Sequence, residues 1–349
     1  MNATETQAAL QSAPKAQLTQ VYVPPPVRLV ALEEHFIYDR LLATYDDTDR
    51  ALLAPLRVPG LDEVGDMRIA EMDRAGIDVQ VLSHTKPGAQ EIEDSAQAAA
   101  LAAAANDYLA EAVARHPTRL AGFATLSTGA PQAAAAELER AVQRLGFKGA
   151  MINGHTRGAY LDQERFWPIF EVAQALDVPI YLHPSNPHPL VYEAYYKDFP
   201  QLGYASWGYA VETATHVLRM ILSGVFDRYP GLRMIIGHMG ELLPFALWRA
   251  DGRLTPKSPH LKKSVRNTFI DHFSVTTSGV FSTQELLCTA GVVGWDKVLF
   301  SVDYPFESNM DAVRWFSNLP IAESDRAKVA HRNAERVLKL APFGAKETL

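Results

Sequence analysis

Short apolar runs alternate with longer amphipathic segments along most of this chain. The longer segments repeat their apolar residues with the period of a helix, whereas the short runs have the length and composition of buried strands. This alternation is typical of parallel βαβ units, and eight runs favour a closed (β/α)8 barrel, the TIM barrel, over an open α/β sheet. The expected strands are 27–36, 79–84, 120–126, 149–153, 178–183, 233–239, 273–277 and 298–303.

The segments between the runs predict the outer helices of the barrel. Gly76 and Gly146 follow two of these segments, at the position where a helix commonly ends in a left-handed residue. Two connections, 37–63 after the first strand and 184–208 after the fifth, are long βα loops, and they lie on the face where barrels place their active sites. The expected helices are 64–75, 90–115, 131–145, 165–176, 209–229, 240–251, 281–291, 308–317 and 323–340.

The two ends of the chain differ from the middle in composition. Residues 1–26 are rich in Ala, Gln and Thr and end in three prolines, a composition that predicts a flexible N-terminal arm. Residues 27–341 are expected to form a single barrel domain, and 342–349 a C-terminal tail. A length of 349 residues is compatible with one barrel that carries insertions.

Charge and cysteine content narrow the class of protein further. The formal net charge of −7 gives no electrostatic footprint for nucleic acid. No apolar run reaches the roughly 18 residues needed to span a bilayer, so no membrane partner is expected. The N-terminus has no secretory pattern, and the single cysteine, Cys288, excludes an internal disulfide, so a cytoplasmic location is expected. Because Cys288 lies in an apolar run, we expect it to be a buried structural thiol.

Ionisable residues gather at the carboxyl ends of four predicted strands. Glu33 and His35 end the first strand, His183 the fifth, His238 the sixth and Asp303 the eighth. Side chains two apart on a strand point to the same side, so Glu33 and His35 can both face the barrel mouth while the glutamate between them points away. An apolar barrel core has no reason to place charges at one end of four strands, because buried unpaired charges cost several kcal/mol each, that is, on the order of ~5 kcal/mol.

This set of residues predicts a metal site. Two histidines and two carboxylates suit a divalent first-row metal such as zinc or manganese. His238 is then either a further ligand or an acid/base group. Asn153, at the end of the fourth strand, is expected to line the same pocket and bind substrate.

Four motifs resemble the amidohydrolase superfamily, and in particular its decarboxylase branch. That branch includes the γ-resorcylate (2,6-dihydroxybenzoate), 2,3-dihydroxybenzoate and 5-carboxyvanillate decarboxylases. The resemblance extends from about residue 27 to residue 341. The motifs are ALEEHF at 31–36, YLHP at 181–184, IGHMGE at 236–241 and FSVDYPFE at 300–307.

The resemblance implies one divalent metal ion, with Mn2+ or Zn2+ expected and Mg2+ possible as a third choice. Many members of the superfamily carry a carbamylated lysine on strand four, but here 149–153 reads GAMIN without a lysine, so a second, bridged metal is not expected. The resembling residues imply that the metal ligands are Glu33, His35, His183 and Asp303.

The activity that the resemblance implies is non-oxidative, reversible decarboxylation of an ortho-hydroxybenzoate of the γ-resorcylate type. The ring carbon is protonated first and CO2 leaves afterwards. Asp303 would deliver the proton, with His238 beside the substrate and oriented by Glu241, and Arg249 would meet an anionic or hydroxyl group of the substrate. The expected partners are a small aromatic carboxylic acid and further copies of the chain in a homodimer or homotetramer.

Other readings of the same residues stay open at this point. A metal-dependent hydrolase such as a lactonase or amidase, a hydratase, and a non-catalytic binding barrel are the alternatives. Tyr304 stands where the γ-resorcylate group is expected to have Trp, and the loop 184–208 also departs from that group. The substrate therefore includes salicylate-type and other dihydroxybenzoate candidates.

Overall fold

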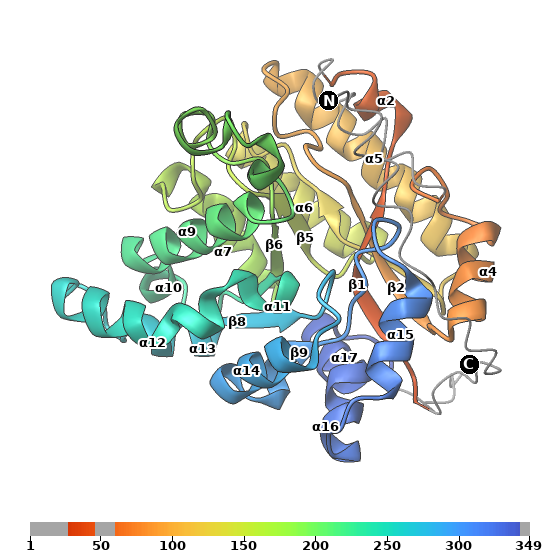
Figure 1. The fold of residues 1–349 in the computed structure, drawn as a ribbon. Helices are drawn as coiled ribbons and strands as arrows, with labels where there is room; N and C mark the ends of the chain where they lie inside the picture. The colour runs from red at the N-terminus through yellow and green to blue at the C-terminus, as the bar shows by residue number, and fades with distance from the viewer. Residues whose placement is uncertain (1–26, 46–59, 343–349) are drawn as a thin grey trace.

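The computed structural model of the chain describes residues 27–45 and 60–342, and it forms a parallel barrel surrounded by helices (Figure 1). The predicted arm 1–26 lies outside these residues, as do 46–59 in the loop after the first strand and 343–349 in the predicted tail. The strands of the barrel are β1 Val30–Phe36, β2 Val79–His84, β3 Leu120–Gly122, β4 Ala124–Thr125, β5 Ala150–Asn153, β6 Ile180–His183, β7 Met234–Ile236, β8 Phe273–Thr276 and β9 Val298–Leu299.

The eight predicted runs correspond to these strands in order, which confirms the barrel. The third run is divided at Phe123 into β3, which pairs with β2, and β4, which pairs with β5. All strand pairs from β1 to β9 are parallel. Between β9 and β1 the side chain of Ser301 takes over, because its hydroxyl accepts from the backbone N–H groups of Leu32 (3.1 Å) and Glu33 (2.7 Å).

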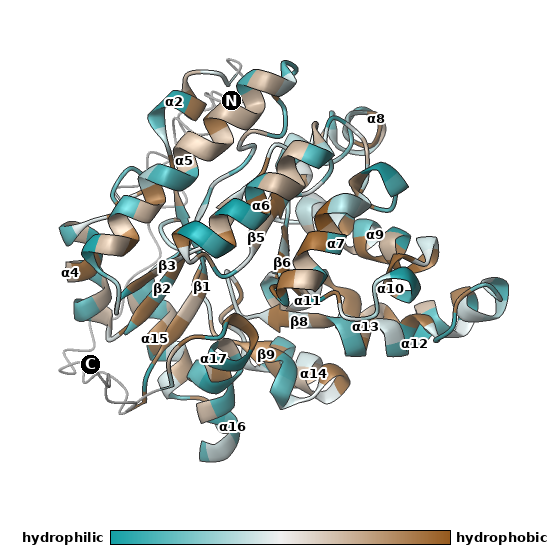
Figure 2. Cartoon of the chain, turned by 180° about the vertical axis from the view of Figure 1, so that it is seen from behind, coloured by the Kyte–Doolittle hydropathy of each residue, from teal (hydrophilic) through white to brown (hydrophobic). Residues whose placement is uncertain are grey.

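Helices cover the outside of the strands, and Figure 2 shows that the central strands are mostly apolar while the helices turn polar residues outward. Gly76 and Gly146 end α4 and α6 with φ of 81° and 74°, as predicted. The helices of the barrel wall are α4 Asp66–Ala75, α5 Ser95–Arg115, α6 Pro131–Leu145, α7 Trp167–Leu176, α9 Gly208–Ser223, α10 Val225–Arg228, α12 Leu243–Leu254, α13 Val265–His272, α14 Thr283–Val293, α15 Asn309–Ser317, α16 Glu323–Ala327 and α17 Asn333–Leu338.

Short elements lie in the connections. A four-residue helix follows the first strand, and the long segment between β6 and α9 contains three short turns of helix. The helix after the first strand is α2 Asp39–Leu42, and the three turns before α9 are α8 Pro189–Val191, η2 Tyr192–Tyr196 and η3 Pro200–Gly203. The short helix α11 His238–Glu241 follows β7. The other short elements are η1 Glu164–Phe166, η4 Thr255–Lys257, η5 Trp295–Lys297 and η6 Lys328–Arg332.

Three expectations need correction. Helix α13 was not predicted from the sequence pattern. The helix expected over 240–251 begins at Leu243, because residues 238–242 all have positive φ and form a left-handed turn instead. Cys288 is exposed rather than buried, since α14 turns Leu286, Thr289 and Ala290 toward the core and leaves Cys288 on the outer face.

The core has two layers. One set of apolar side chains fills the inside of the barrel, and a larger set lies between the strands and the helices. The interior set includes Leu32, Val81, Phe123 and Ile235, all fully buried. Because this packing closes the barrel below, the ionisable side chains at the carboxyl ends of the strands lie at the bottom of an open mouth.

Candidate metal centre and active site

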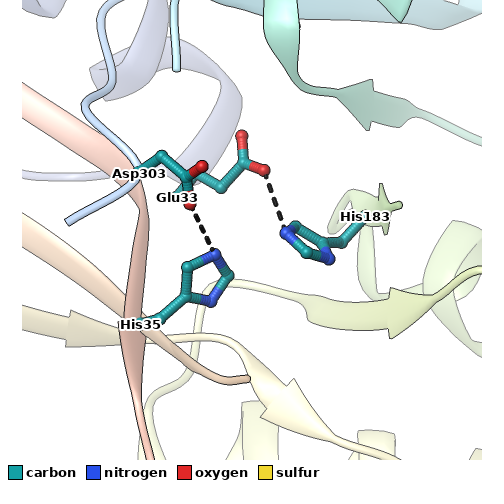
Figure 3. A group of neighbouring side chains, drawn as sticks. All are labelled: Glu33, His35, His183 and Asp303. Carbon is teal, nitrogen blue, oxygen red and sulfur yellow. Dashed lines mark ion pairs between the residues drawn. The ribbon is translucent and has the colours of Figure 1, made fainter. Parts of the chain in front are cut away.

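Four side chains converge at the carboxyl end of the barrel, and Figure 3 shows them pointing toward one another. Glu33 and His35 come from β1, His183 from the end of β6, and Asp303 from the segment after β9. His35 Nε2 lies 3.0 Å from Asp303 Oδ1, and His183 Nε2 lies 3.3 Å from Glu33 Oε1. One ligand atom from each residue falls within 4.8 Å of all the others, which is the spacing of a metal site.

The donor atoms also fit a metal by what they lack. Glu33 Oε1, His35 Nε2 and Asp303 Oδ1 are buried and form no hydrogen bond with the described residues, although they approach one another closely. Buried polar atoms that lack a hydrogen bond are rare and costly, and the nearest polar neighbours of these atoms are other possible metal ligands, so the group fits a bound cation. Two nitrogen and two oxygen donors suit one divalent ion such as Mn2+.

Three hydroxyl groups bind one oxygen of the Glu33 carboxylate and so orient the other oxygen toward the cluster. Tyr181, Ser278 and Thr276 all donate to its second oxygen, Oε2. Glu33 is fully buried, and burial raises its pKa against the nearby charges of His238 and His35. The three hydroxyls therefore stabilise the ionised carboxylate and leave Oε1 for the metal.

The candidate histidine ligand from β6, His183, is held neutral. Burial lowers the pKa of His183 well below its usual value, and the neighbouring His35 lowers it further. Metal binding requires an unprotonated imidazole nitrogen, so this environment prepares His183 as a ligand.

A glycine makes room for Glu33 at the end of β7. A Cβ atom on Gly237 would lie 2.6 Å from Glu33 Oε2 and 3.0 Å from Ser278 Oγ. A larger residue would therefore force the Glu33 carboxylate or the backbone at Gly237 to shift. The sequence motif around His238 therefore contains a glycine for steric reasons.

His238 lies beside the cluster rather than in it. Its Nδ1 is 2.7 Å from Glu241 Oε1, and its Nε2 is 3.5 Å from Asp303 Oδ2. Burial lowers the pKa of His238, but the charges of Glu241 and Glu33 outweigh this and hold it well above the usual value. Residues 238–242 form a left-handed turn, and within it Glu241 contacts the imidazole three residues before it.

Asp303 is held as a carboxylate. Burial raises its pKa, but His238 and His35 together outweigh burial and leave the pKa well below the usual value. One oxygen, Oδ1, faces the cluster, and the other, Oδ2, faces His238. The side chain can therefore serve a metal with one oxygen and a proton with the other.

A cavity of about 380 Å³ opens above these residues. On its wall, Lys86 Nζ donates to Asn186 Oδ1 (2.8 Å) and lies over the ring of Tyr209 at 4.6 Å, while the Tyr209 hydroxyl donates to the same oxygen (3.1 Å). The cavity is lined by Thr85, Lys86, Pro87, His183, Pro184, Ser185, Asn186, Tyr204, Ala205, Tyr209, His238, Asp303, Phe306 and Glu307.

The two substrate contacts expected from the sequence do not line this cavity. Arg249 is exposed on α12, and Asn153 is buried at the end of β5, where its backbone pairs with the side chain of Gln90. Lys86 and Asn186 were not expected as site residues. The available signal was their position just after strand ends, the place where a barrel builds its site.

Fold and cluster together define a barrel enzyme with a site for one divalent metal ion. The sequence profile of the amidohydrolase family matches residues 35–340, and the chain belongs to this family. Throughout the described residues, no helix is long and apolar enough to cross a membrane.

Several characterised proteins are similar over nearly their whole length. The γ-resorcylate decarboxylase of Polaromonas sp. (strain JS666) is 44% identical over 328 residues, which cover 89% of this chain and 98% of that protein. The crystal structure of a dihydroxybenzoic acid decarboxylase from Polaromonas sp. JS666, with bound manganese and the inhibitor 2-nitroresorcinol, is 42% identical with a TM-score of 0.82, covering 90% of this chain and 97% of that one. The 5-carboxyvanillate decarboxylase of Sphingomonas paucimobilis is 36% identical with a TM-score of 0.84, covering 90% and 100%.

Proposed function

We propose that this protein is a metal-dependent carboxy-lyase that removes CO2 from an ortho-hydroxybenzoate of the γ-resorcylate type without oxidation. The observation that carries the proposal is the cluster of Glu33, His35, His183 and Asp303 at the base of a cavity, in a chain 44% identical to a γ-resorcylate decarboxylase. The reaction is reversible in principle, because it consumes no oxidant or other co-substrate. In the reverse direction the phenol takes up CO2 and the ring carbon releases its proton.

The proposed ligands are Glu33, His35, His183 and Asp303, and Mn2+ is the proposed ion because a similar structure contains manganese. Zn2+ and Mg2+ are the ions to compare with it. When bound, a divalent ion supplies a positive charge that orients the substrate carboxylate and its ortho hydroxyl and acts as a Lewis acid. Strand β5, Ala150–Asn153, contains no lysine for a bridging carbamate, which supports one ion rather than two.

The residues of the chain account for the proton that the reaction needs. Direct loss of CO2 would leave a carbanion in the ring plane, so protonation of the ring carbon that bears the carboxylate comes first. Asp303 is the proposed proton donor to that carbon, through Oδ2. The C–C electron pair then returns to the ring as CO2 leaves. His238, kept protonated by Glu241 and 3.5 Å from Asp303 Oδ2, is the proposed source of the proton that Asp303 delivers.

The cavity wall suggests how an aromatic acid is held. Tyr204 and Phe306 offer aromatic surface, while Lys86 and Asn186 offer polar groups at the wall. We propose these residues as substrate contacts. Asn153 and Arg249, the substrate contacts expected from the sequence, do not line this cavity. Their contact with the substrate stays a prediction from the sequence.

The direct test of the proposed activity is a substrate panel. The purified protein with Mn2+ is incubated with 2,6-dihydroxybenzoate, 2,3-dihydroxybenzoate, salicylate and 5-carboxyvanillate, and CO2 and the phenolic product are measured together. We expect CO2 release from at least one member, with resorcinol as the product of 2,6-dihydroxybenzoate. A protein inert toward the whole panel that opens lactones, cleaves amides or hydrates a double bond would instead be a hydrolase or hydratase.

A homo-oligomer is the proposed assembly, in line with the expected homodimer or homotetramer. Helix α12, at the periphery of the molecule in Figure 1, exposes Phe245 by 88% and Trp248 by 82%, with Leu242 beside them at 46%. Clustered large apolar side chains on a surface mark protein interfaces. Arg249 lies on the same helix and would therefore lie at or near this interface. The cytoplasmic location stays a prediction from the sequence.

A further inference from the structure

Glu34, between two of the proposed metal ligands, points away from the cluster into a fully buried position. Its carboxylate receives three hydrogen bonds from the segment after β9. Ser301 Oγ (3.1 Å) and the backbone N–H of Val302 (3.0 Å) donate to Oε1, and the backbone N–H of Tyr304 (3.0 Å) donates to Oε2. The two backbone donors flank Asp303 on both sides, so Glu34 holds the peptide groups from which Asp303 projects.

Asp303 has a backbone conformation that needs such support. Its φ of 77° lies in the left-handed region, which costs a residue other than glycine on the order of 1–2 kcal/mol. The same stretch is also held on its other side, because the backbone N–H of His35 donates to the carbonyl of Tyr304 (2.6 Å). Strand β1 thus provides two metal ligands and, through the residue between them, grips the loop that carries a third.

A buried arginine supports strand β1 and the segment 301–304 from the outside of the barrel. Arg68 Nη2 donates to the carbonyl of His35 (2.7 Å) and to that of Gly60 (2.9 Å), and its guanidinium lies 4.9 Å above the ring of Tyr304. Tyr304 therefore packs against Arg68 and is absent from the lining of the cavity. We therefore expect the presence of Tyr instead of Trp at position 304 to affect the packing of this segment rather than contact with the substrate.

We propose that Glu34 is a positioning residue that fixes the direction of the Asp303 carboxylate, and through it both the affinity of the metal site and the delivery of the proton. This inference rests on the proposed function for the proton, while the metal part stands on the cluster itself. An alternative is that Glu34 only closes the barrel between β9 and β1. The two explanations differ in whether the effect of Glu34 requires Asp303.

A double-mutant cycle with Mn2+ affinity as the readout separates them. In Glu34→Gln one oxygen becomes an NH2 group, which cannot accept from a backbone N–H and leaves a buried donor unpaired. We expect Mn2+ affinity, measured by calorimetry and by electron paramagnetic resonance, to fall by about 10–100-fold, the range found for residues that orient metal ligands. In an Asp303→Asn background the same substitution should change Mn2+ affinity by less than about 2-fold, because the ligand that it positions is already lost.

The matched control is Asn333→Ala. Asn333 Nδ2 donates to the carbonyls of Trp295 and Val298, both at 2.8 Å, so it anchors the opposite end of β9 and is equally buried. We expect this variant to have a lower Tm than the wild type, while its Mn2+ affinity and its kcat stay at the wild-type values. Glu34→Gln should lower kcat more than it changes KM, since the substrate still binds while the proton donor is misdirected.

Equal losses of Mn2+ affinity in the wild-type and Asp303→Asn backgrounds would overturn the proposal, as would a Tm loss in Glu34→Gln with unchanged Mn2+ affinity. Should Glu34→Gln not accumulate as folded protein, Ser301→Ala removes one of the three donors and keeps the carboxylate. Because Ser301 Oγ also accepts from the backbone N–H groups of Leu32 and Glu33, this variant is made in both the wild-type and the Asp303→Asn backgrounds. The proposal expects a loss of Mn2+ affinity that is larger in the wild-type background, and an equal or absent loss would count against it. Metal affinity does not depend on the substrate, so a failure here is distinct from a failure to decarboxylate.

Discussion

At the scale of single residues, we propose two roles for the side chain of Asp303, one for each carboxylate oxygen. Oδ1 faces the proposed metal position, and Oδ2 faces His238 at 3.5 Å. The structure holds Asp303 as a carboxylate and His238 as an imidazolium, because both pKa values move away from each other. A proton can therefore pass from His238 to Asp303 only when the charges around them change, as they do when an anionic substrate enters.

Asp303→Asn tests this division of tasks. The amide cannot carry the transferred proton and is a weaker ligand, so we expect kcat for decarboxylation to fall by about 10²–10⁴-fold, the range for loss of a general acid. Initial rates of CO2 release at saturating metal measure the effect. Asp311→Asn is the control, because its side chain is exposed on the neighbouring helix α15. An Asp303→Asn enzyme with a kcat close to that of the control would rule out Asp303 as the proton donor.

The sequence predicted the proposed ligand residues better than the residues that hold them. Glu33 and His35 could be predicted because the two-residue period of a strand places them on one side. Glu34, Lys86 and Tyr181 could not be assigned roles, since their contacts depend on how distant segments close against each other. The hydrogen bonds of Glu34 to the segment after β9, for example, span about 268 positions in the chain.

At the scale of elements, strand ends were predictable and irregular turns were not. The left-handed turn over residues 238–242 replaces the first turn of a predicted helix, and only one of its five residues, Gly240, is a glycine. The other four carry no local signal for positive φ, so the tertiary structure imposes the turn. His238 and Glu241 contact each other within this turn, so the turn belongs to the site.

A buried histidine in α9 makes stability depend on pH. His216 is fully buried, and its Nε2 accepts from the backbone N–H of Leu161 (2.9 Å). Burial, together with the nearby charge of His155, lowers the pKa of His216 to about 3. The unfolded chain therefore binds a proton that the folded chain refuses, so this contribution to stability is intact above the ordinary histidine pKa of about 6.5 and is lost as pH falls below it.

His216→Gln should reduce that pH dependence, because the amide oxygen can accept from Leu161 without titrating. Between about pH 7 and about pH 5, the free energy of unfolding of the wild type should fall by roughly 1–2 kcal/mol more than that of the variant. Urea denaturation at the two pH values measures the difference, and the other titrating groups cancel in it. The same loss in both proteins would mean that His216 is protonated in the folded state.

At the scale of the whole molecule, the exposed face of α12 is the feature that a single chain leaves unexplained. Phe245 and Trp248 are each more than four-fifths exposed. If this face joins two chains, Phe245→Asp with Trp248→Asp should lower the molar mass measured by light scattering after gel filtration to that of one chain or a smaller oligomer. Met67→Asp, another exposed apolar residue on the separate helix α4, is the control. An unchanged mass in the double variant would exclude α12 from the interface.

The barrel itself was predictable at this scale, because eight apolar runs in alternation with helical segments leave few other arrangements. The assembly was not, since an exposed apolar face is recognisable only once the helix has been oriented on the barrel. The identity of the substrate could not be predicted for the same reason, because the cavity wall combines residues from separate segments. They are Lys86 after β2, Asn186 after β6 and Tyr209 in α9.

The central claim is that one divalent ion at the four-residue cluster is required for decarboxylation, and a metal titration tests it most directly. Protein freed of metal by chelation receives increasing Mn2+ while CO2 release from 2,6-dihydroxybenzoate, or from the best substrate of the panel, and bound metal are measured on the same sample. We predict no CO2 release without metal and full activity at one bound ion per chain. Undiminished CO2 release from metal-free protein, or activity that requires a second ion, would contradict the account.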